Sequence, residues 1–168
     1  MPSLEFDRAT KDISKAVIKE ALPKSDIHAL IDRVTTVSKG THVVQLFDPA
    51  SIANKTHILG AYLNALLAFK NHTNRSKSIG MEMLLFVSLT DQIHLAIEIA
   101  GAKPDSKVVV FASGADAFSK MAPMLKSVAD FNPGSAHQGA VLKRLGVKNA
   151  GGAYNSIMQA MAVSRLGP

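Results

Sequence analysis

Six histidines and one isolated carboxylate are the residues of this chain that could take part in acid–base or metal chemistry. The histidines stand singly along the sequence, at His28, His42, His57, His72, His94 and His137. His94 has a carboxylate at ligand spacing, because Glu98 lies one helical turn further on. A pair without a third ligand is more typical of an exposed helix contact than of a metal site. We therefore predict neither a metal site nor a cofactor.

Glu82 is the only acidic residue between Asp48 and Asp91, and it stands in an apolar run. A buried carboxylate at this position could serve as a general acid or base. The alternative is an exposed residue in the first turn of a helix, where the helix dipole favours negative charge. We prefer this second interpretation, which gives Glu82 no catalytic role.

The sequence motifs of common enzyme classes are missing. We find no GxxxxGK[ST] phosphate loop, no GxGxxG after a strand, no GxSxG elbow and no HExxH. Residues 134–139 resemble a phosphate loop only superficially, since they include no lysine and follow no strand. We expect a turn before a helix there, and a protein that is not an enzyme. A small enzyme that uses Glu82 or a histidine in an unrecognised pocket is the alternative.

Positive charge is concentrated in the C-terminal part of the chain. The net charge is +6; residues 1–100 hold 11 Lys/Arg against 10 Asp/Glu, whereas residues 101–168 hold 8 against 3. A basic surface attracts nucleic acid or an acidic protein. The cations that could contact phosphates are Lys55, Lys70, Arg75, Lys77, Lys143, Arg144 and Lys148. An ordinary solvated face is the equal alternative.

Length and composition predict one globular domain over residues 1–168. The chain has no cysteine, which excludes disulfides, thiolate zinc sites and a cysteine nucleophile. Its first residues are charged and lack the apolar core of a signal peptide, and no run reaches the 18 apolar residues typical of a membrane span. We expect a cytoplasmic protein without a membrane partner.

Residues 78–101 carry the strongest helical pattern, and the other elements are expected to pack around them. A short buried helix is predicted over 81–89, and a strand is the alternative for this continuous apolar run. A second helix follows, with Thr90 as N-cap and Gly101 as a left-handed C-terminal residue. Its apolar face recurs at Ile93, Ala96, Ile97 and Ala100. We expect this face to be scaffold, with burial of Ile93 or Ile97 contributing roughly 1.5 to 3 kcal/mol each.

The elements before this stretch are predicted from periodicity and caps. A helix is expected over 4–22, ended by Pro23, and a second over 25–33, capped by Ser25. Strands are expected at 34–37 and 42–47. A long amphipathic helix is predicted over 54–70 with Asn54 as N-cap, followed by a polar, basic loop over 71–78.

After residue 101, strands and helices are again expected to alternate. A buried strand is expected at 107–111, then a helix over 114–130 with a kink or break at Pro123. A helix over 136–145 ends at Gly146, and a last one over 153–166 follows Gly151 and Gly152. Because the strands are separated by helices, we expect a sheet that is covered by helices.

The order of several short motifs resembles a known family. They are V-x-L-F-D-P-x-x-I (44–52), K-x-H-I-x-x-A (55–61), E-x-L-L-x-x-x-S-x-T-x-Q-I-x-x-A-I-x-x-x-G (82–101) and V-V-V-F (108–111). Together with L-K-R-L-G-V and I-M-Q-A-M-A-V-S-R-L near the end, they resemble the PRPK-binding protein family, the kinase-binding subunit of the KEOPS (EKC) complex. The likeness covers most of 42–168; residues 1–40 match loosely. Members commonly have Gly at the position of Leu89 and a basic residue at that of Asp91.

The resemblance implies an accessory protein without an active site. Its fold would be α+β, with a small mixed, mainly antiparallel sheet flanked by several helices in a single domain. Such subunits dock on the small atypical kinase/ATPase of the complex and stimulate it. They also bind the 3′ end of tRNA, while another subunit makes threonylcarbamoyladenosine.

For tRNA binding we expect a cluster where the long helix begins. Two of its residues open that helix, and the basic loop over 71–78 is expected nearby. The predicted tRNA-binding residues are Lys55, His57, Arg75 and Lys77. A generic basic interaction module without preference for tRNA is the alternative.

For the kinase we expect the last helix to supply an apolar interface, since methionine side chains fill irregular contacts well. Packing against the core of the same chain is the alternative for this helix. The predicted partner-binding residues are Ile157, Met158, Met161 and Leu166.

Overall fold

The computed structural model describes residues 13–148 and 152–164, and in this part of the chain a four-stranded open sheet forms the centre. The strands are β1 (Val17–Pro23), β2 (Val44–Phe47), β3 (Val108–Ala112) and β4 (Leu125–Asp130). Their order is β2-β3-β1-β4, and every neighbouring pair is antiparallel. The prediction of a small α+β fold with a mainly antiparallel sheet is confirmed.

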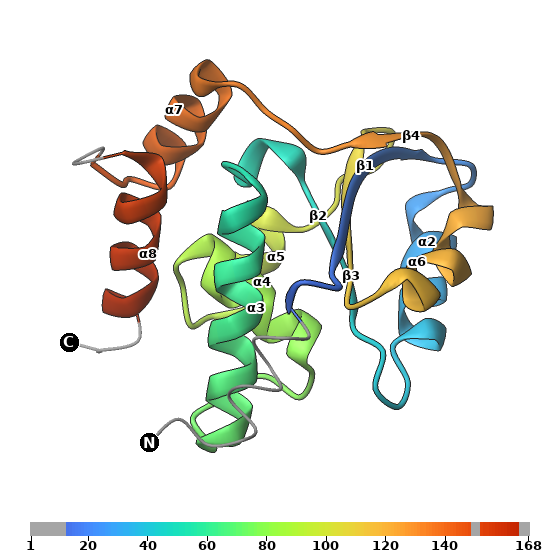
Figure 1. Cartoon of the computed structure of the whole chain (residues 1–168), viewed down its shortest axis with the longest axis horizontal. Helices are drawn as coiled ribbons and strands as arrows, with labels where there is room; N and C mark the ends of the chain where they lie inside the picture. Colours follow the sequence, from blue (N-terminus) through green and yellow to red (C-terminus); the bar gives the residue numbers. More distant parts are fainter. Residues whose placement is uncertain (1–12, 149–151, 165–168) are drawn as a thin grey trace.

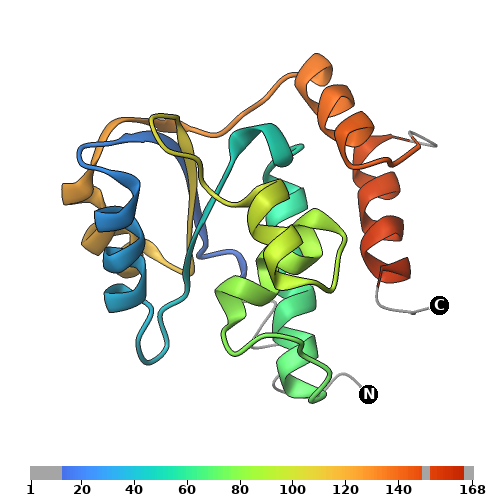
Figure 2. The ribbon, with the colours of Figure 1, turned by 180° about the vertical axis from the view of Figure 1, so that it is seen from behind.

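Helices cover both faces of this sheet (Figure 1). They are α2 (Ile27–Val37), α3 (Lys55–Lys70), α4 (Ile79–Ser88), α5 (Ile93–Ala100), α6 (Ala115–Met121), α7 (Ser135–Arg144) and α8 (Ala153–Val163), with short 3-10 turns at Pro49–Ser51 and Ala122–Met124. Helices α2 and α6 lie on one face and α3, α4 and α5 on the other, with α7 and α8 outside α3 (Figures 1 and 2).

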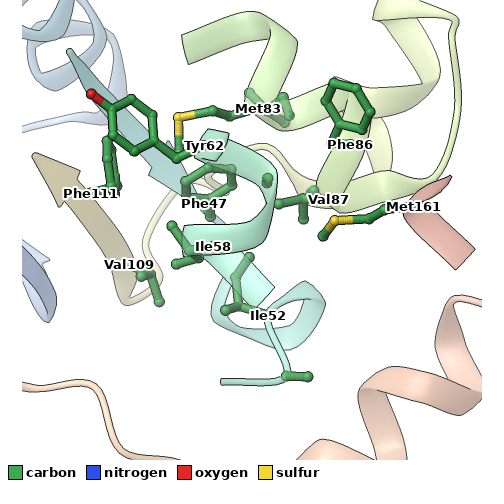
Figure 3. Close-up of a cluster of buried hydrophobic side chains, with 14 of the residues drawn as sticks. Phe47, Ile52, Ile58, Tyr62, Met83, Phe86, Val87, Val109, Phe111 and Met161 are labelled. Atoms are coloured by element: carbon green, nitrogen blue, oxygen red, sulfur yellow. The ribbon is translucent and has the colours of Figure 1, made fainter. Parts of the chain in front are cut away.

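The strand β3 is buried along its whole length and separates two cores. Its side chains alternate between the faces, as the period of a strand requires. Val109 and Phe111 belong to the larger core under α3, α4 and α5, whereas Val108 and Val110 belong to the smaller core under α2 and α6. In the larger core the rings of Tyr62 and Phe111 lie 4.8 Å apart between centroids, and aliphatic and Met side chains surround them (Figure 3).

The long helix α3 is confirmed with the cap that the sequence predicts. Asn54 Oδ1 accepts a hydrogen bond from His57 N–H at 2.9 Å, which satisfies one of the orphan donors of the first turn. The strands predicted at 42–47 and 107–111 are also present, as β2 and β3. The helix predicted over 136–145 is α7, and Gly146 follows it with a φ of 71°.

Residues 17–23 form a strand, so the helix predicted over 4–22 is wrong over 17–22. The strand β1 pairs with β3 on one side and β4 on the other. Its side chains divide between the faces, with Ile18 in the larger core and Ala21 in the smaller one. Pairing on two sides outweighs the helical spacing of a few apolar residues, since propensity differences are below about 1 kcal/mol per residue.

Residues 34–37 form the last turn of α2, so the strand predicted there is wrong. The hydroxyls of Thr35 and Thr36 donate to the carbonyls of Ile31 and Asp32, which accommodates these β-branched residues inside a helix. The N-cap of α2 is Asp26, which accepts from Ala29 N–H, and not Ser25.

The second half of the helix predicted over 114–130 is the strand β4. Pro123 lies in the 3-10 turn that ends α6, and residues 125–130 then pair with β1. Ser127 has a φ of 53° where the register shifts, which is the geometry of a bulge. The open side of β1 provides backbone partners that a longer α6 would leave unused.

The buried face of α5 differs from the predicted one. Ala96 and Ala100 are fully buried, whereas Ile93 and Ile97 are 41% and 47% exposed. The two alanines let α5 approach its neighbours closely, and this turns the larger isoleucines toward solvent. Their predicted role as buried scaffold is therefore wrong.

The ends of α5 also differ from the prediction. The N-cap of α5 is Gln92 and not Thr90, whose hydroxyl accepts from Gln92 N–H. Gly101 is extended, with a φ of −67°. The left-handed residue is instead Leu89, with a φ of 58°, at the end of α4. A residue with a Cβ is strained in this left-handed conformation, so glycine would be more favourable than leucine at position 89.

Candidate functional site

The N-terminal end of α3 carries an ion-pair cluster. Lys55 Nζ donates to both carboxylate oxygens of Asp130 on β4, at 2.7 and 2.8 Å, and Lys19 Nζ lies 3.6 Å from the same carboxylate. The hydrogen bond from Lys55 lowers the pKa of Asp130, and the charges of Lys55 and Lys19 add to this effect. Part of the positive charge of Lys55 is therefore already compensated within the chain.

His57, two residues further along α3, lies in the core. Its side chain is 1% exposed, so an RNA on the surface does not reach it. Nδ1 accepts from Ala53 N–H at 3.1 Å, which leaves the proton of the neutral ring on Nε2. Within the described residues Nε2 has no hydrogen-bond partner in good geometry, although the nearby carbonyl of Val87 acts on the ring. Burial dominates and lowers the pKa of His57 to about 4.

The basic loop over 71–78 lies at the opposite end of α3. The helix has 16 residues, which makes it about 24 Å long. Arg75 and Lys77 follow its C-terminus, whereas Lys55 begins it. The four residues predicted to bind tRNA thus divide into one buried histidine, one paired lysine and a separate pair of exposed cations on the loop.

Glu82 fixes the loop that carries this pair of cations. Its carboxylate accepts from Arg75 N–H and Ser76 N–H, at 3.0 and 2.9 Å, and from the hydroxyl of Ser76 at 2.8 Å. The side chain is fully buried, so the predicted exposed position at the start of the helix is wrong. Its first-turn position in α4 is confirmed, and the positive end of α4 favours the charge there.

The role of Glu82 is what sequence reasoning missed. The isolated position of Glu82 in the sequence indicates this role, because a single acid inside an apolar run needs buried hydrogen-bond donors if it stays charged. Those donors come from the backbone of the preceding loop, and the sequence does not reveal where that loop folds. Glu82 therefore positions the loop that carries Arg75 and Lys77.

Helix α8 packs against α3 through residues predicted to bind a partner. Ile157 and Met161 are buried in the larger core. Met158 lies against Gly60, where an added Cβ would come within 2.6 Å of the Met158 sulfur. The glycine thus permits the close approach of the two helices. Leu166, the fourth predicted residue, lies outside the described residues.

The remaining titratable groups of the described residues are spread over several places in the fold. His42 pairs with Asp116 at 3.1 Å, and His137 Nε2 contacts the carbonyl of Ile52 at 2.8 Å. In residues 13–148 and 152–164, no three His, Asp or Glu side chains come together in a way that would hold a metal ion. Arg144 donates to the carbonyl of Ile99 at 3.0 Å and therefore has a structural contact.

Membrane-spanning length is not reached by any one helix of the described chain. The pair α4 and α5 has sufficient length and apolar composition only when taken together, and the two helices are bent by 71° relative to one another. Residues 82–88 of α4 are buried within this chain.

Comparison with known proteins identifies a family. No curated protein matches the chain significantly. The family model described as kinase binding protein CGI-121 matches residues 11–145. The matched region extends from just before β1 to just after α7, covers well over half of the chain and includes all four strands. This result confirms the family that the sequence motifs indicated. The chain belongs to the CGI-121 family of kinase-binding proteins.

Proposed function

We propose that this protein is a non-catalytic accessory subunit of the KEOPS complex. It binds and stimulates the small atypical kinase/ATPase of that complex and binds the 3′ end of tRNA. In this way it supports threonylcarbamoyladenosine modification in the cytosol. The observation that carries the kinase-binding part is the family match over residues 11–145. The tRNA-binding part rests on the motif resemblance and on the cations of the loop.

For tRNA, the proposal centres on Arg75 and Lys77. Both side chains are exposed, and the hydrogen bonds from Arg75 N–H and Ser76 N–H to Glu82 hold their backbone. A fixed loop loses less conformational freedom when it contacts phosphates. Lys55 is not assigned a phosphate contact, because Asp130 already pairs with it. His57 supports the fold of α3 and does not contact RNA in this proposal.

For the kinase, the proposal assigns the outer face of α8. The predicted residues Ile157 and Met161 hold this helix on α3, and Met158 seals it against Gly60. The surface offered to a partner is then formed by Gln159, Ala162 and Val163, and Val163 is 64% exposed. An exposed valine beside small and polar residues is suited to the apolar centre of an interface.

The kinase part is tested by co-purification with the atypical kinase of the same organism and by ATPase assays with and without this chain. Stimulation of ATP hydrolysis is expected. Val163→Asp should weaken the complex at least about tenfold, the loss typical of a contact worth more than about 1.4 kcal/mol. Val128→Asp is the matched control, because Val128 is 43% exposed but lies on β4. A Val163→Asp variant that still binds and stimulates the kinase would exclude α8 as the interface.

The tRNA part is tested by comparing tRNA with and without its 3′ terminus. The double variant Arg75→Glu/Lys77→Glu should bind intact tRNA much more weakly, while Lys24→Glu/Lys39→Glu, which reverses two other exposed lysines, should bind normally. Equal binding of both tRNA forms would instead indicate a generic basic module.

A further inference from the structure

A groove lies between α2 on one side and α4 and α5 on the other. It has a volume of about 600 Å³, and residues of the edge strand β2 line it between the helices. In Figure 2 the blue-green strand β2 runs between α2 and the α4–α5 pair. The size is within the range of small-molecule sites, which are mostly apolar with a few polar groups.

Apolar side chains from three helices line the groove. Ile31 comes from α2, Ile79 and Leu84 come from α4, and Ile97 comes from α5. Ile31 and Ile97 are 45% and 47% exposed, so both present apolar surface to water. An apolar ligand that lies between these two residues would remove their surface from water, and this burial would favour binding.

The edge of β2 is not available for an added peptide strand. Val44 N–H donates to Ser38 Oγ at 3.3 Å, and Leu46 N–H donates to Gln45 Oε1 at 3.0 Å. The helix α4 also comes close, since a Cβ at Gly80 would lie 3.3 Å from the Val44 carbonyl oxygen. Strand addition requires free backbone groups along the edge. The groove therefore suits a compact molecule better than an extended peptide.

The polar lining leaves one group for a ligand. Ser38 and Gln45 are occupied as described, Thr35 Oγ1 donates to a carbonyl of its own helix, and Ser78 Oγ accepts from Met81 N–H. Lys77 is the only charged side chain among the lining residues, and it forms no ion pair or hydrogen bond within the described part of the chain. A ligand that matches this lining has an apolar body and one negative charge.

We propose that the groove binds a compact apolar carboxylate, such as a medium-chain fatty acid or an aromatic acid. Its hydrocarbon part lies between Ile31 and Ile97, and its carboxylate is next to Lys77. This inference does not depend on the function proposed above, because it rests on the lining of the groove alone.

The test compares octanoate with octanol, which has the same chain length but no charge. Each is titrated into the full chain, and binding is followed by NMR of the isoleucine methyl groups. Octanoate should shift the signals of Ile31, Ile79 and Ile97, with a dissociation constant on the order of a millimolar or tighter.

Matched variants distinguish the contribution of the Lys77 charge to binding from that of the apolar side chains. Lys77→Gln should weaken octanoate binding about three- to fivefold at low salt, the effect of an exposed ion pair, and should leave octanol unchanged. Lys24→Gln, an exposed lysine away from the groove, should change neither. Ile97→Asn should weaken both ligands, whereas Ile93→Asn, on the same helix but not lining the groove, should weaken neither.

Three results would overturn the proposal. Octanoate that shifts no signal at Ile31 or Ile97 would show that the groove is not a site for such ligands. Equal octanoate binding by the Lys77 and Lys24 variants would remove the role of the charge. Groove signals that respond to tRNA and not to octanoate would assign the groove to an RNA surface.

Discussion

At the scale of single residues, two polar side chains of this protein are buried in different ways. His57 is buried as a neutral ring without a partner for Nε2 among the described residues. Glu82 is buried with three hydrogen-bond donors from the loop before α4. Burial disfavours the charged form of His57, whereas the carboxylate of Glu82 accepts hydrogen bonds from the loop. The pH dependence of folding should depend on His57, and the rigidity of the basic loop over 71–78 should depend on Glu82.

The stability of the protein should fall on acidification between pH 6.5 and about 4. His57 has a pKa near 6.5 in the unfolded chain and about 4 in the fold, so the unfolded state binds more protons in this range. The contribution of neutral His57 to the stability is complete above pH 6.5 and decreases as the pH falls. Below pH 4 the loss reaches about 3 kcal/mol. Urea unfolding at several pH values measures the loss.

Two substitutions isolate this effect. His57→Gln should make the stability less dependent on pH in this window, whatever its effect at neutral pH. His94→Gln, which replaces an exposed histidine on α5, should leave the dependence as in the native chain. A wild-type stability that is constant from pH 7 to 4.5 would contradict the burial of a neutral His57.

Glu82→Ala should release the loop over 71–78. The substitution leaves Arg75 N–H, Ser76 N–H and the Ser76 hydroxyl without their acceptor, at a cost of about 2 to 3 kcal/mol. Urea unfolding measures this loss, and amide exchange at residues 75 and 76 should accelerate. Glu98→Ala, at an exposed acid on α5, should change the stability by less than about 0.5 kcal/mol. Unchanged exchange at residue 76 would show that Glu82 does not hold the loop.

At the scale of elements, the short helix α5 shows how packing selects a face. Its sequence offers four apolar positions on one side, but the small residues Ala96 and Ala100 make the contact and Ile93 and Ile97 remain 41% and 47% exposed. A helix packs against its neighbours through the side chains that allow the closest approach. The same arrangement leaves Ile97 on the wall of the groove beside β2.

Ala96→Asp and Ile93→Asp should therefore differ strongly. A carboxylate at position 96 would be buried without a partner and should cost several kcal/mol, about 3 to 5. The same change at Ile93 places the charge at the surface and should cost less than about 1 kcal/mol. Thermal or urea unfolding of the two variants distinguishes the faces. A larger loss for Ile93→Asp than for Ala96→Asp would show that the isoleucine face is the packed one.

At the scale of the whole molecule, the length of α3 separates the cations that sequence reasoning grouped together. Lys55 lies at one end with Asp130, and Arg75 and Lys77 follow the other end, about 24 Å away. A single-stranded RNA end that contacts only the loop meets two cations. The expected electrostatic contribution to binding is correspondingly modest.

The salt dependence of tRNA binding should reflect this separation. Two phosphate contacts to single-stranded RNA predict a slope of about −1.5 for the logarithm of the binding constant against that of the salt concentration. Binding isotherms between low and moderate salt measure it. Lys55→Gln should leave the slope unchanged, and Lys77→Gln should make it shallower. A slope steeper than about −3, reduced by Lys55→Gln, would show that the RNA contacts both ends of α3.

The sequence alone determined the elements whose signals are local. Asn54 marks the start of α3, the apolar run at 108–111 gives a buried strand, and the order of the motifs indicates the family that the match over 11–145 confirms. A cap and a periodic run act within a few residues of the chain, so their physical causes are present in the sequence.

Only the tertiary structure decided the features that depend on distant partners. Residues 17–23 became a strand because β3 and β4 pair with them, and Ile93 became exposed because Ala96 packs more closely. Glu82 was buried because loop amides satisfy it, and Lys55 was separated from Arg75 by the length of α3. Pairing and desolvation bring together groups far apart in the chain, and their free energies exceed the weak local preferences that periodicity records.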